Sequence, residues 1–522
     1  MNRVPMRWIH PLAPGARESA DVLGGKGHGL VVLRRLGLPV PAGFVIGTRA
    51  CRAFLRDGRL PEGFDADLSA AVRRLEAATG RRFGAGPRPL AVSVRSGAAV
   101  SMPGMMSTVL DLGLTTEATA ALAAETGDPA FADETRRRFL MSFATATDGI
   151  PDLADATDAD AAAPSAAMTV PDDAMSLLRA AVRAVFSSWN NPRAVTYREL
   201  HGVPHDLGTA VIVQAMVFGN RDGRSGTGVA FSRDPNTGGR TPFGDVLFGG
   251  QGEDVVSGRS STRPLSELAD REPSVWERLV AALHRVERHY RDACHVEFTF
   301  ETGDLWFLQV RPGGLAGRAA VRVAVDLADE RLIDRRTALR RISPRHLRGA
   351  RTPRIRTGLG IDLLTRGRGA CPGVATGRVA VTADRAVRMA AEGPVILVRP
   401  VTSPLDMHGL AAASGVVTSR GGPASHAAVV ARAMGKAAVV DAAGLTVDAE
   451  AGCARVGERV VPEGTLITID GTGGEVAAGD PGVGAALVDE HLHRLLDWAD
   501  EVSGDRSARP DEERLGAAHA RL

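Results

Sequence analysis

Residues 416–432, VVTSRGGPASHAAVVAR, combine the residue types and the order that phosphoryl chemistry on a histidine requires. An apolar run typical of a strand leads into the Gly421–Gly422 turn, and His426 stands just before an Ala- and Val-rich run of helical length. Glycine permits the tight turn, and the backbone donors at a helix start favour an anion. The pattern indicates a nucleophilic histidine. A histidine that only caps a helix is the competing interpretation for this residue taken alone.

Lysine is nearly absent from the chain, and the two that remain carry information. Of 63 basic residues only Lys26 and Lys436 are lysines. Such a bias is typical of a codon preference, so a surviving lysine can indicate a position that needs a compact ammonium. Lys26 lies among the four glycines of residues 24–29, and we expect it to bind phosphate in a glycine-rich loop before a helix at 30–36. For Lys436 the sequence leaves function and chance survival equally open.

Arg95 is the second candidate for phosphate binding. It ends a strand-like run at residues 90–96 and leads into a loop of small residues and methionines, residues 96–106. A glycine loop alone is a weak signal for a nucleotide. Its combination with an arginine and a loop that can fold over a ligand strengthens the prediction.

A third group of candidates lies near residue 300. Glu297 and Gln309 stand on two strand-like runs separated by a Gly303–Asp304 turn. Two oxygen ligands on adjacent strands suit Mg²⁺, which takes few protein ligands together with nucleotide phosphates. Arg311 lies on the same face of its strand as Gln309, where it could neutralise charge on a transferring phosphoryl group. A surface ion pair is the alternative for each of them singly.

Composition excludes several other classes of protein. The chain has 522 residues, 44% of them hydrophobic, and a formal net charge of +2, so we expect about three domains and no nucleic-acid or membrane partner. Aromatic residues make up 4%, too few for base-stacking surfaces. The four cysteines form no CxxC pair. The sequence shows no apolar leader and no long apolar run, and we predict a cytoplasmic protein.

The order of turns, strands and helices predicts an α/β (α+β) multidomain protein. We expect a nucleotide-binding domain at 1–317 with a helical insert at about 115–183, in which residues 152–167 are of low complexity. Residues 318–368 hold fourteen arginines against five acids and are predicted to form a helical linker. A compact β-rich domain follows at 369–480, and residues 481–522 are predicted to form a polar helical tail.

Together these features resemble a known family, the pyruvate, phosphate dikinases among the phosphoenolpyruvate-utilising enzymes. The resemblance rests on four long strings, which are residues 93–106, 214–220, 225–231 and 251–256. Residues 21–350 look like the ATP-grasp nucleotide-binding domain of that family, and residues 369–480 look like its small β/β/α swivelling phosphohistidine domain. The methionine-rich loop favours the dikinase over its relative phosphoenolpyruvate synthase.

The resemblance implies a reaction and a role for each candidate. His426 would receive the β-phosphoryl group of ATP in a reaction that also consumes phosphate and releases AMP and pyrophosphate. Mg²⁺ would be the cofactor. The implied roles are: ATP phosphate binding by Lys26 and Arg95; the adenine pocket at Gln214, Met216 and Val217; Mg²⁺ ligation by Glu297 and Gln309; and stabilisation of transfer by Arg311.

The sequence departs from the family's pattern in three places. His295 stands where the family has an Asp two residues before the metal-binding Glu, which weakens the predicted metal site. Ala424 stands where the family often has a Thr, so regulation by phosphorylation of that Thr is not expected. Only about forty residues follow Gly479, whereas the family's phosphoenolpyruvate/pyruvate barrel needs ~250 residues. We therefore expect a separate chain to supply the acceptor site.

These departures keep a second interpretation open. The chain could be a catalytically weak ATP-binding or phosphocarrier module that regulates a partner. Antibiotic phosphorylation, as in the related rifampicin phosphotransferase, would need a large substrate domain between the two domains, and the linker at 318–368 leaves no room for one.

Overall fold

The computed structural model describes residues 8–100, 102, 104–147, 172–257, 262–315, 317–351, 354–355, 361–484 and 490–522. The chain forms two compact units. The first comprises residues 1–221 with 306–310, and the second comprises residues 222–305 with 311–522. The low-complexity patch predicted at 152–167 lies outside the described residues. No helix in the described ranges is long and apolar enough to cross a membrane.

The first unit is built on an antiparallel sheet with the order β1-β2-β7-β5-β6. Its strands are β1 (Ile9–Pro11), β2 (Gly43–Ile46), β5 (Val92–Gly97), β6 (Thr108–Leu112) and β7 (Ala210–Ala215), with a small pair β3 (Arg82–Phe83) and β4 (Pro89–Leu90). Its helices are α1 (Ala20–Arg35), α2 (Thr48–Asp57), α3 (Phe64–Thr79), α4 (Thr116–Thr126), α5 (Pro129–Thr147), α6 (Ala174–Ser187), η2 (Ser188–Asn190) and α7 (Pro192–His201). The strand-like run predicted at 90–96 corresponds to β5, and α4 to α6 lie in the region of the helical insert predicted at about 115–183.

The alternation of side chains along β5 and β7 decides which residues face the core of this unit. Val92 and Val94 pack with Val211 and Val213 into a large hydrophobic cluster under the helices. Because the side-chain period of a strand is two, Arg95 and Gln214 point to the opposite face. The β-rich sequence therefore places the predicted nucleotide residues on the face away from the core.

Helix α1 differs from the expectation of a loop at 24–29 followed by a helix at 30–36. Residues Ala20–Arg35 form one helical element, interrupted at Gly24, whose φ is +69°. A Cβ at Gly24 would come within 1.4 Å of the Gly97 carbonyl oxygen, so the interruption brings α1 against β5. Gly25 N also donates to Ala98 O at 3.0 Å. Lys26 is therefore helical and lies two residues after the break at Gly24. The glycines do not form an open loop, because Gly24 is needed for the close approach of the α1 and β5 backbones.

The second unit begins with the strands β10, β9, β8 and β11 of one sheet, whereas residues 306–310 of β12 (Asp304–Pro312) belong to the first unit. The elements of this part of the second unit are β8 (Gly226–Phe231), β9 (Phe243–Phe248), α8 (Gly252–Ser257), β10 (Arg263–Pro264), α9 (Glu267–Arg271), α10 (Pro273–Tyr290) and β11 (Cys294–Glu301). Alternation on β11 buries Val296 and Phe298 and leaves His295 and Glu297 on the other face.

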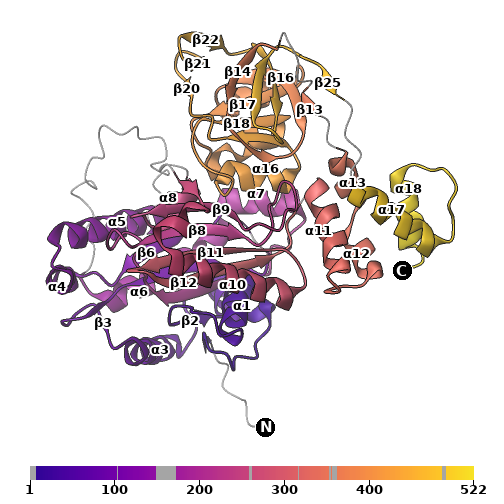
Figure 1. Cartoon of the computed structure of the whole chain (residues 1–522). Helices are drawn as coiled ribbons and strands as arrows, with labels where there is room; N and C mark the ends of the chain where they lie inside the picture. Colours follow the sequence, from indigo (N-terminus) through magenta and orange to yellow (C-terminus); the bar gives the residue numbers. More distant parts are fainter. Residues whose placement is uncertain are drawn as a thin grey trace. The chain divides into compact units, whose positions relative to one another are not determined.

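The predicted linker and the predicted tail form one helical layer in the same unit. The helices are α11 (Gly317–Asp329), α12 (Arg335–Arg341), α13 (Pro344–Ala350), α17 (Glu490–Ser503) and α18 (Asp511–His519) (Figure 1). Their apolar faces share one core, which includes Val325, Leu339, Leu496 and Leu515. Arginines of the linker meet acids of the tail, as in the Arg351–Asp511 pair at 2.6 Å. The tail is polar on its outer face only.

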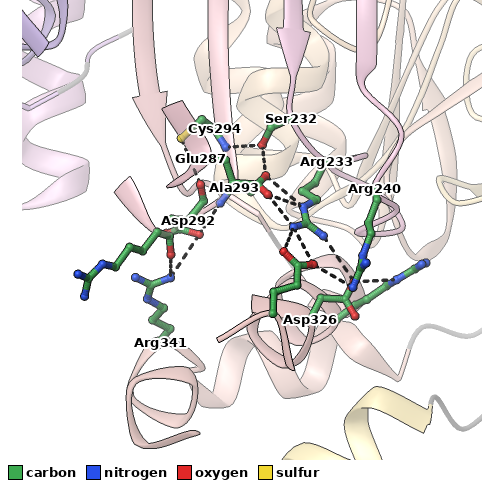
Figure 2. Close-up of polar contacts among 12 residues, drawn as sticks. Ser232, Arg233, Arg240, Glu287, Asp292, Ala293, Cys294, Asp326 and Arg341 are labelled. Carbon is green, nitrogen blue, oxygen red and sulfur yellow. Dashed lines mark hydrogen bonds and ion pairs between the residues drawn. The ribbon is translucent and has the colours of Figure 1, made fainter. Parts of the chain in front are cut away.

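Ion pairs connect this layer to the elements that precede it, as Figure 2 shows. Arg233, just after β8, lies 2.6 Å from Glu287 of α10 and 3.6 Å from Asp326 of α11, and its side chain is only 4% exposed. Arg341 of α12 lies 3.7 Å from Asp292, but these two side chains are 30% and 29% exposed. Breaking a buried pair by removing one partner is costly, so the pairs of Arg233 fix α11 by charge as well as by packing.

The last part of the second unit is a layered β/β/α domain. An eight-stranded sheet of order β14-β24-β23-β16-β17-β18-β19-β15 lies between a helical layer and the small sheet β20-β21-β22. Its strands are β14 (Leu363–Arg366), β15 (Arg368–Cys371), β16 (Val374–Ala380), β17 (Val395–Arg399), β18 (Gly415–Thr418), β19 (Ala437–Val440), β20 (Leu445–Asp448), β21 (Cys453–Val456), β22 (Arg459–Pro462), β23 (Leu466–Asp470) and β24 (Glu475–Ala478). The helices are α14 (Ala383–Ala390), η3 (Pro404–Asp406), α15 (Met407–Ala412) and α16 (His426–Met434), and a short ribbon pairs β13 (Arg354–Ile355) with β25 (Val483–Gly484).

Strands β16, β17, β18 and β19 run parallel, each joined to the next through a helix. In such a sheet the loops that follow the carboxyl ends of the strands gather at one edge, which is the usual place for a ligand. His426 follows β18, and the 402–406 segment follows β17. The mixed α/β multidomain architecture predicted from the sequence is confirmed, and its last part is a compact β/β/α domain that carries His426.

Candidate active site

His426 is the first residue of helix α16. The chain leaves β18 at Thr418, turns at Gly421, whose φ is +95°, and enters α16 directly after Ser425. Helix α16 ends at Gly435 in the left-handed conformation, with Lys436 N bonded to Ala431 O at 3.0 Å. The predicted strand, glycine turn and helix are all present. The histidine stands where the helix dipole favours negative charge.

The two ring nitrogens of His426 have different surroundings. Nδ1 lies 3.1 Å from Thr402 Oγ1, whereas Nε2 is buried and has no hydrogen-bond partner among the described residues. Burial lowers the pKa of His426 to about 4, and the Asp406 carboxylate opposes that shift in part. The imidazole is therefore neutral at neutral pH. With the proton on Nδ1 donated to Thr402, the lone pair on Nε2 is available to attack an electrophile.

The residues that support His426 from β17 were not found from the sequence. A capping box encloses residues 403–406, in which Ser403 N donates to Asp406 Oδ2 at 2.8 Å. Arg399 Nε lies 3.2 Å from Asp406 Oδ1, which fixes the same turn from the end of β17. The string Thr402-Ser-Pro-Leu-Asp406 after an apolar run is a helix-start pattern, and that signal could have indicated a second loop at the edge of the sheet.

Asp245 of β9 holds the turn before His426. Its carboxylate is fully buried, accepts from Ala424 N at 3.2 Å and pairs with Arg368 at 2.7 Å. A Cβ at Gly422 would lie 2.3 Å from Asp245 Oδ2. The second glycine of the turn is therefore required by the close approach of a carboxylate, which the sequence alone did not predict.

Arg432, near the end of α16, was also not predicted from the sequence. Its guanidinium donates to Pro423 O at 2.6 Å and to Ala370 O at 2.9 Å, and it lies 5.5 Å from the centre of the Phe231 ring. Burial lowers its pKa to about 10, still far above neutrality. Arg432 thus ties the glycine turn to the helix that follows it.

His295, which replaces the family's Asp, stacks on Phe231 with ring centres 5.0 Å apart. Burial lowers the pKa of His295 to about 4, with Arg311 acting in the same direction and Glu297 opposing. The position is therefore neutral, and the negative charge that a carboxylate would supply there is absent. Glu297 and Arg311 lie close enough to His295 to influence its charge, so these two predicted residues share one region of the second unit.

The residues of the first unit that are predicted to bind a nucleotide lie on or beside β5 and β7. Arg95 donates to Gln214 Oε1 at 2.6 Å and to Leu308 O at 3.3 Å. Gln214 is buried, and its Nε2 donates to Pro41 O at 3.0 Å. Lys26 is half-buried at the break in α1, and its Cβ lies near Gly97 of β5. Arg95 of β5 and Gln214 of β7 therefore lie on paired strands, and Lys26 of α1 lies beside β5. Gln214 is the partner that fixes the Arg95 guanidinium.

Met216 and Val217 follow β7 and are both half-buried. Met216 N donates to Ala91 O at 2.9 Å, and the Met216 side chain packs against a small cluster that includes Phe218. Of the methionine-rich loop, residues 101 and 103 lie outside the described part. Met105 is buried, and its carbonyl accepts from Arg193 at 3.2 Å. The adenine pocket at these residues stays a prediction.

The donors of the predicted metal site suit Mg²⁺ in kind. Gln309 of β12 is buried, and neither atom of its amide has a hydrogen-bond partner among the described residues. A buried amide oxygen of this type is an available ligand, and Glu297 offers a carboxylate. No group of three or more His, Cys, Asp and Glu side chains suited to a metal occurs in the described ranges. The metal site at Glu297 and Gln309 stays a prediction.

Two parts of the chain match known family models. Residues 60–275 match "Pyruvate phosphate dikinase, AMP/ATP-binding domain", and residues 391–474 match "PEP-utilising enzyme, mobile domain". The second range contains His426, Thr402 and Asp406.

Several similar proteins are named pyruvate, phosphate dikinase. The chain is 40% identical over 540 residues to pyruvate, phosphate dikinase of Rhizobium meliloti (strain 1021), a match that covers 95% of this chain and 60% of the relative. It is 37% identical to the enzyme of Clostridium symbiosum, again over 95% of this chain and 60% of the relative. With the chloroplastic pyruvate, phosphate dikinase 1 of Oryza sativa subsp. japonica the identity is 39%, over 94% of this chain and 55% of the relative. The chain therefore spans about 60% or less of the length of these relatives. It carries an AMP/ATP-binding domain of the pyruvate phosphate dikinase type and a mobile domain of the PEP-utilising enzymes.

Proposed function

We propose that this chain is an ATP- and phosphate-dependent phosphotransferase of the pyruvate, phosphate dikinase type, with His426 as the residue that is phosphorylated. One observation carries the proposal. His426 is buried and neutral, its Nδ1 contacts Thr402, and its Nε2 has no partner among the described residues. It also lies in the range that matches the mobile domain.

The proposed step balances as follows. The lone pair of Nε2 attacks the β-phosphorus of ATP, an N–P bond forms, and the bond from that phosphorus to the bridging α-oxygen breaks, so AMP leaves with the electron pair. An oxygen of inorganic phosphate then attacks the γ-phosphorus, the bond from that phosphorus to the β,γ-bridging oxygen breaks, and pyrophosphate leaves while the bridging oxygen stays on the β-phosphoryl group. The proton on Nδ1 stays in place, because Thr402 holds it. His426 then carries the β-phosphoryl group alone.

The other predicted residues take their roles in this proposal. Lys26 and Arg95 bind the phosphates of ATP, and residues 214–217 line the adenine pocket. Glu297 and Gln309 would hold Mg²⁺, which when bound neutralises phosphate charge. Arg311 stabilises the transferring group.

The acceptor is proposed to be pyruvate or another small molecule bound outside residues 1–522. The described elements contain no (β/α)₈ barrel of the kind such an acceptor site uses. We propose that a phosphoenolpyruvate/pyruvate-binding barrel supplies it. Adding such a barrel should support phosphoenolpyruvate formation from pyruvate.

The neutral His295 favours a second candidate, a weak ATP-binding or phosphocarrier module that regulates a partner. One carboxylate fewer beside Glu297 means weaker attraction for a divalent cation. The two candidates differ in rate and not in the residue that is phosphorylated.

The test is the fate of labelled ATP. Purified protein with Mg²⁺, phosphate and β-³²P-ATP should form an acid-labile, base-stable phosphohistidine, and γ-label should leave as pyrophosphate. His426→Asn should abolish labelling, whereas His408→Asn, a change at an exposed histidine of α15 paired with Asp384, should not. Retention of γ-label would refute the dikinase proposal, and slow labelling with normal ATP binding would favour the regulatory module.

A further inference from the structure

Ser425 occupies the N-cap position of α16 without acting as a cap. A serine at this position normally accepts a hydrogen bond from a backbone N–H in the first turn. Thr115, Ser343 and Thr382 do so at the starts of α4, α13 and α14. Ser425 makes no such bond. It is only 5% exposed, and its Oγ has no hydrogen-bond partner among the described residues.

The neighbouring His426 presents the same anomaly. Its Nε2 is likewise buried without a partner in the described part of the chain. Leaving a buried polar group unsatisfied costs free energy, and here two such groups are adjacent in sequence at the positive end of a nine-residue helix. A ligand with several acceptor oxygens would satisfy Ser425 and form its bond at Nε2.

The charges around the site are arranged to tolerate such a ligand. The carboxylates that bear on this segment are Asp245 and Asp406. Each is paired with an arginine, Asp245 with Arg368 at 2.7 Å and Asp406 with Arg399 at 3.2 Å. Neither is therefore an uncompensated negative charge beside a phosphoryl group.

We propose that the Ser425 hydroxyl is a phosphoryl-binding group, which donates its hydrogen bond to an oxygen of the phosphoryl group carried on His426 Nε2. The inference rests on the proposed function, because it needs a phosphorylated His426. The serine keeps its proton and forms no covalent bond. The hydroxyl is withheld from capping so that it becomes paired only after transfer, and it stabilises the phosphorylated state relative to the free one.

The test measures that equilibrium. At fixed concentrations of ATP, phosphate, AMP and pyrophosphate, the ratio of phosphorylated to free His426 should fall about tenfold or more in Ser425→Ala, the loss expected for a hydrogen bond to a charged group. Ser425→Thr, which keeps the hydroxyl, should restore most of the ratio. Thr418→Val is the matched control, because Thr418 Oγ1 is also buried without a described partner but belongs to β18, and its ratio should stay unchanged.

Two further readouts separate the possible outcomes. The ³¹P resonance of the phosphohistidine should shift in Ser425→Ala, and the melting temperature of the unphosphorylated variant should not fall, since no cap is lost. An unchanged ratio and resonance, or a lower melting temperature with an unchanged ratio, would overturn the inference and leave the proposed function intact. Phosphate found on Ser425 itself by mass spectrometry would also overturn it. Absence of any phosphohistidine in the unaltered protein would instead refute the proposed function, and the inference with it.

Discussion

Gln214 in the first unit is buried with both ends of its amide in hydrogen bonds, whereas Ser425 and His426 in the second unit are buried with Oγ and Nε2 unpartnered among the described residues. The first arrangement fixes a charged side chain, Arg95, by contacts that exist before any ligand arrives. The second leaves Oγ and Nε2 buried and without a hydrogen-bond partner in the described part of the chain.

The difference teaches what each region has to do. A group that binds phosphate electrostatically benefits from being held in one orientation, and a network of hydrogen bonds provides that. A nucleophile needs its lone pair, so a hydrogen bond to Nε2 would hinder it. Packing and the contact of Nδ1 with Thr402 must then keep the histidine in place. The following predictions test this contrast, from the largest expected effect to the smallest.

The first prediction concerns pH and the histidine site. The pKa of His426 is lowered from 6.5 to about 4 in the folded protein. Between pH 6.5 and pH 4 the imidazole is therefore protonated in the unfolded chain but neutral in the folded domain. Stability should therefore fall as the pH drops from 6.5 towards 4, by up to about 3 kcal/mol from this group, and should be unaffected by it above 6.5. Asp406 is the charged group that opposes the shift.

The measurement is the free energy of unfolding in urea at pH 7 and pH 4.5, in the unaltered protein and in His426→Asn. The variant should lose less stability on acidification, because the asparagine does not titrate. Equal losses in both proteins would show that His426 is not held neutral by burial. The comparison within one background matters, since His295 has a similarly lowered pKa in the same unit.

The histidine site and its helix were open to prediction from sequence because their signals are local. The apolar run, the Gly421–Gly422 turn and the Ala-rich helix are consecutive, so the position of His426 followed from them. The strand that carries Arg95 was likewise indicated, at residues 90–96. Neither the position of His426 nor this strand therefore needed knowledge of tertiary contacts.

What could not be predicted comes from residues far apart in sequence. Asp245 explains why residue 422 must be glycine, yet 177 positions separate the two, and no local pattern links them. Thr402, which contacts Nδ1 of His426, comes from a different loop. The glycines of residues 24–29 were interpreted as a loop because glycine is rare within helices, whereas Gly24 serves the contact between α1 and β5. Such features depend on which elements meet, which is a property of the fold.

The second prediction compares the two regions by matched substitutions. Gln214→Leu removes the acceptor of Arg95 and the donor to Pro41 O, and should destabilise the first unit by about 2 kcal/mol. Thr418→Val removes a buried hydroxyl with no described partner, and should change stability by only about 0.5 kcal/mol or improve it. Hydrogen exchange of peptides from β7 and β18 would report the two effects separately. Similar costs for both would break the contrast between satisfied and unsatisfied polar groups.

The third prediction, with the smallest expected effect, concerns the two lysines. Like the two regions compared above, one lysine is held by hydrogen bonds within the protein and the other is proposed to bind a ligand. Lys436 Nζ donates to the carbonyl oxygens of Leu410, Ala411 and Ala413 at the end of α15, the first at 3.0 Å and the last at 2.5 Å. This compact ammonium caps the helix, and burial lowers its pKa while the contacts remain. The sequence left open whether Lys436 has a function or survives by chance. The contacts of its ammonium give it a structural role.

Lys436→Arg should cost about 1 kcal/mol, because a planar guanidinium cannot direct donors to three converging carbonyls from the same point. Its rate of autophosphorylation should stay near that of the unaltered protein. Lys26→Arg should behave in the opposite way, with unchanged stability and impaired autophosphorylation, since the ammonium at the break of α1 is proposed to bind ATP. Urea unfolding and the labelling assay on both variants decide the matter. If Lys26→Arg labelled at the full rate, Lys26 would be a chance survivor of the arginine bias, and Arg95 would remain the sole basic residue proposed for ATP in the first unit.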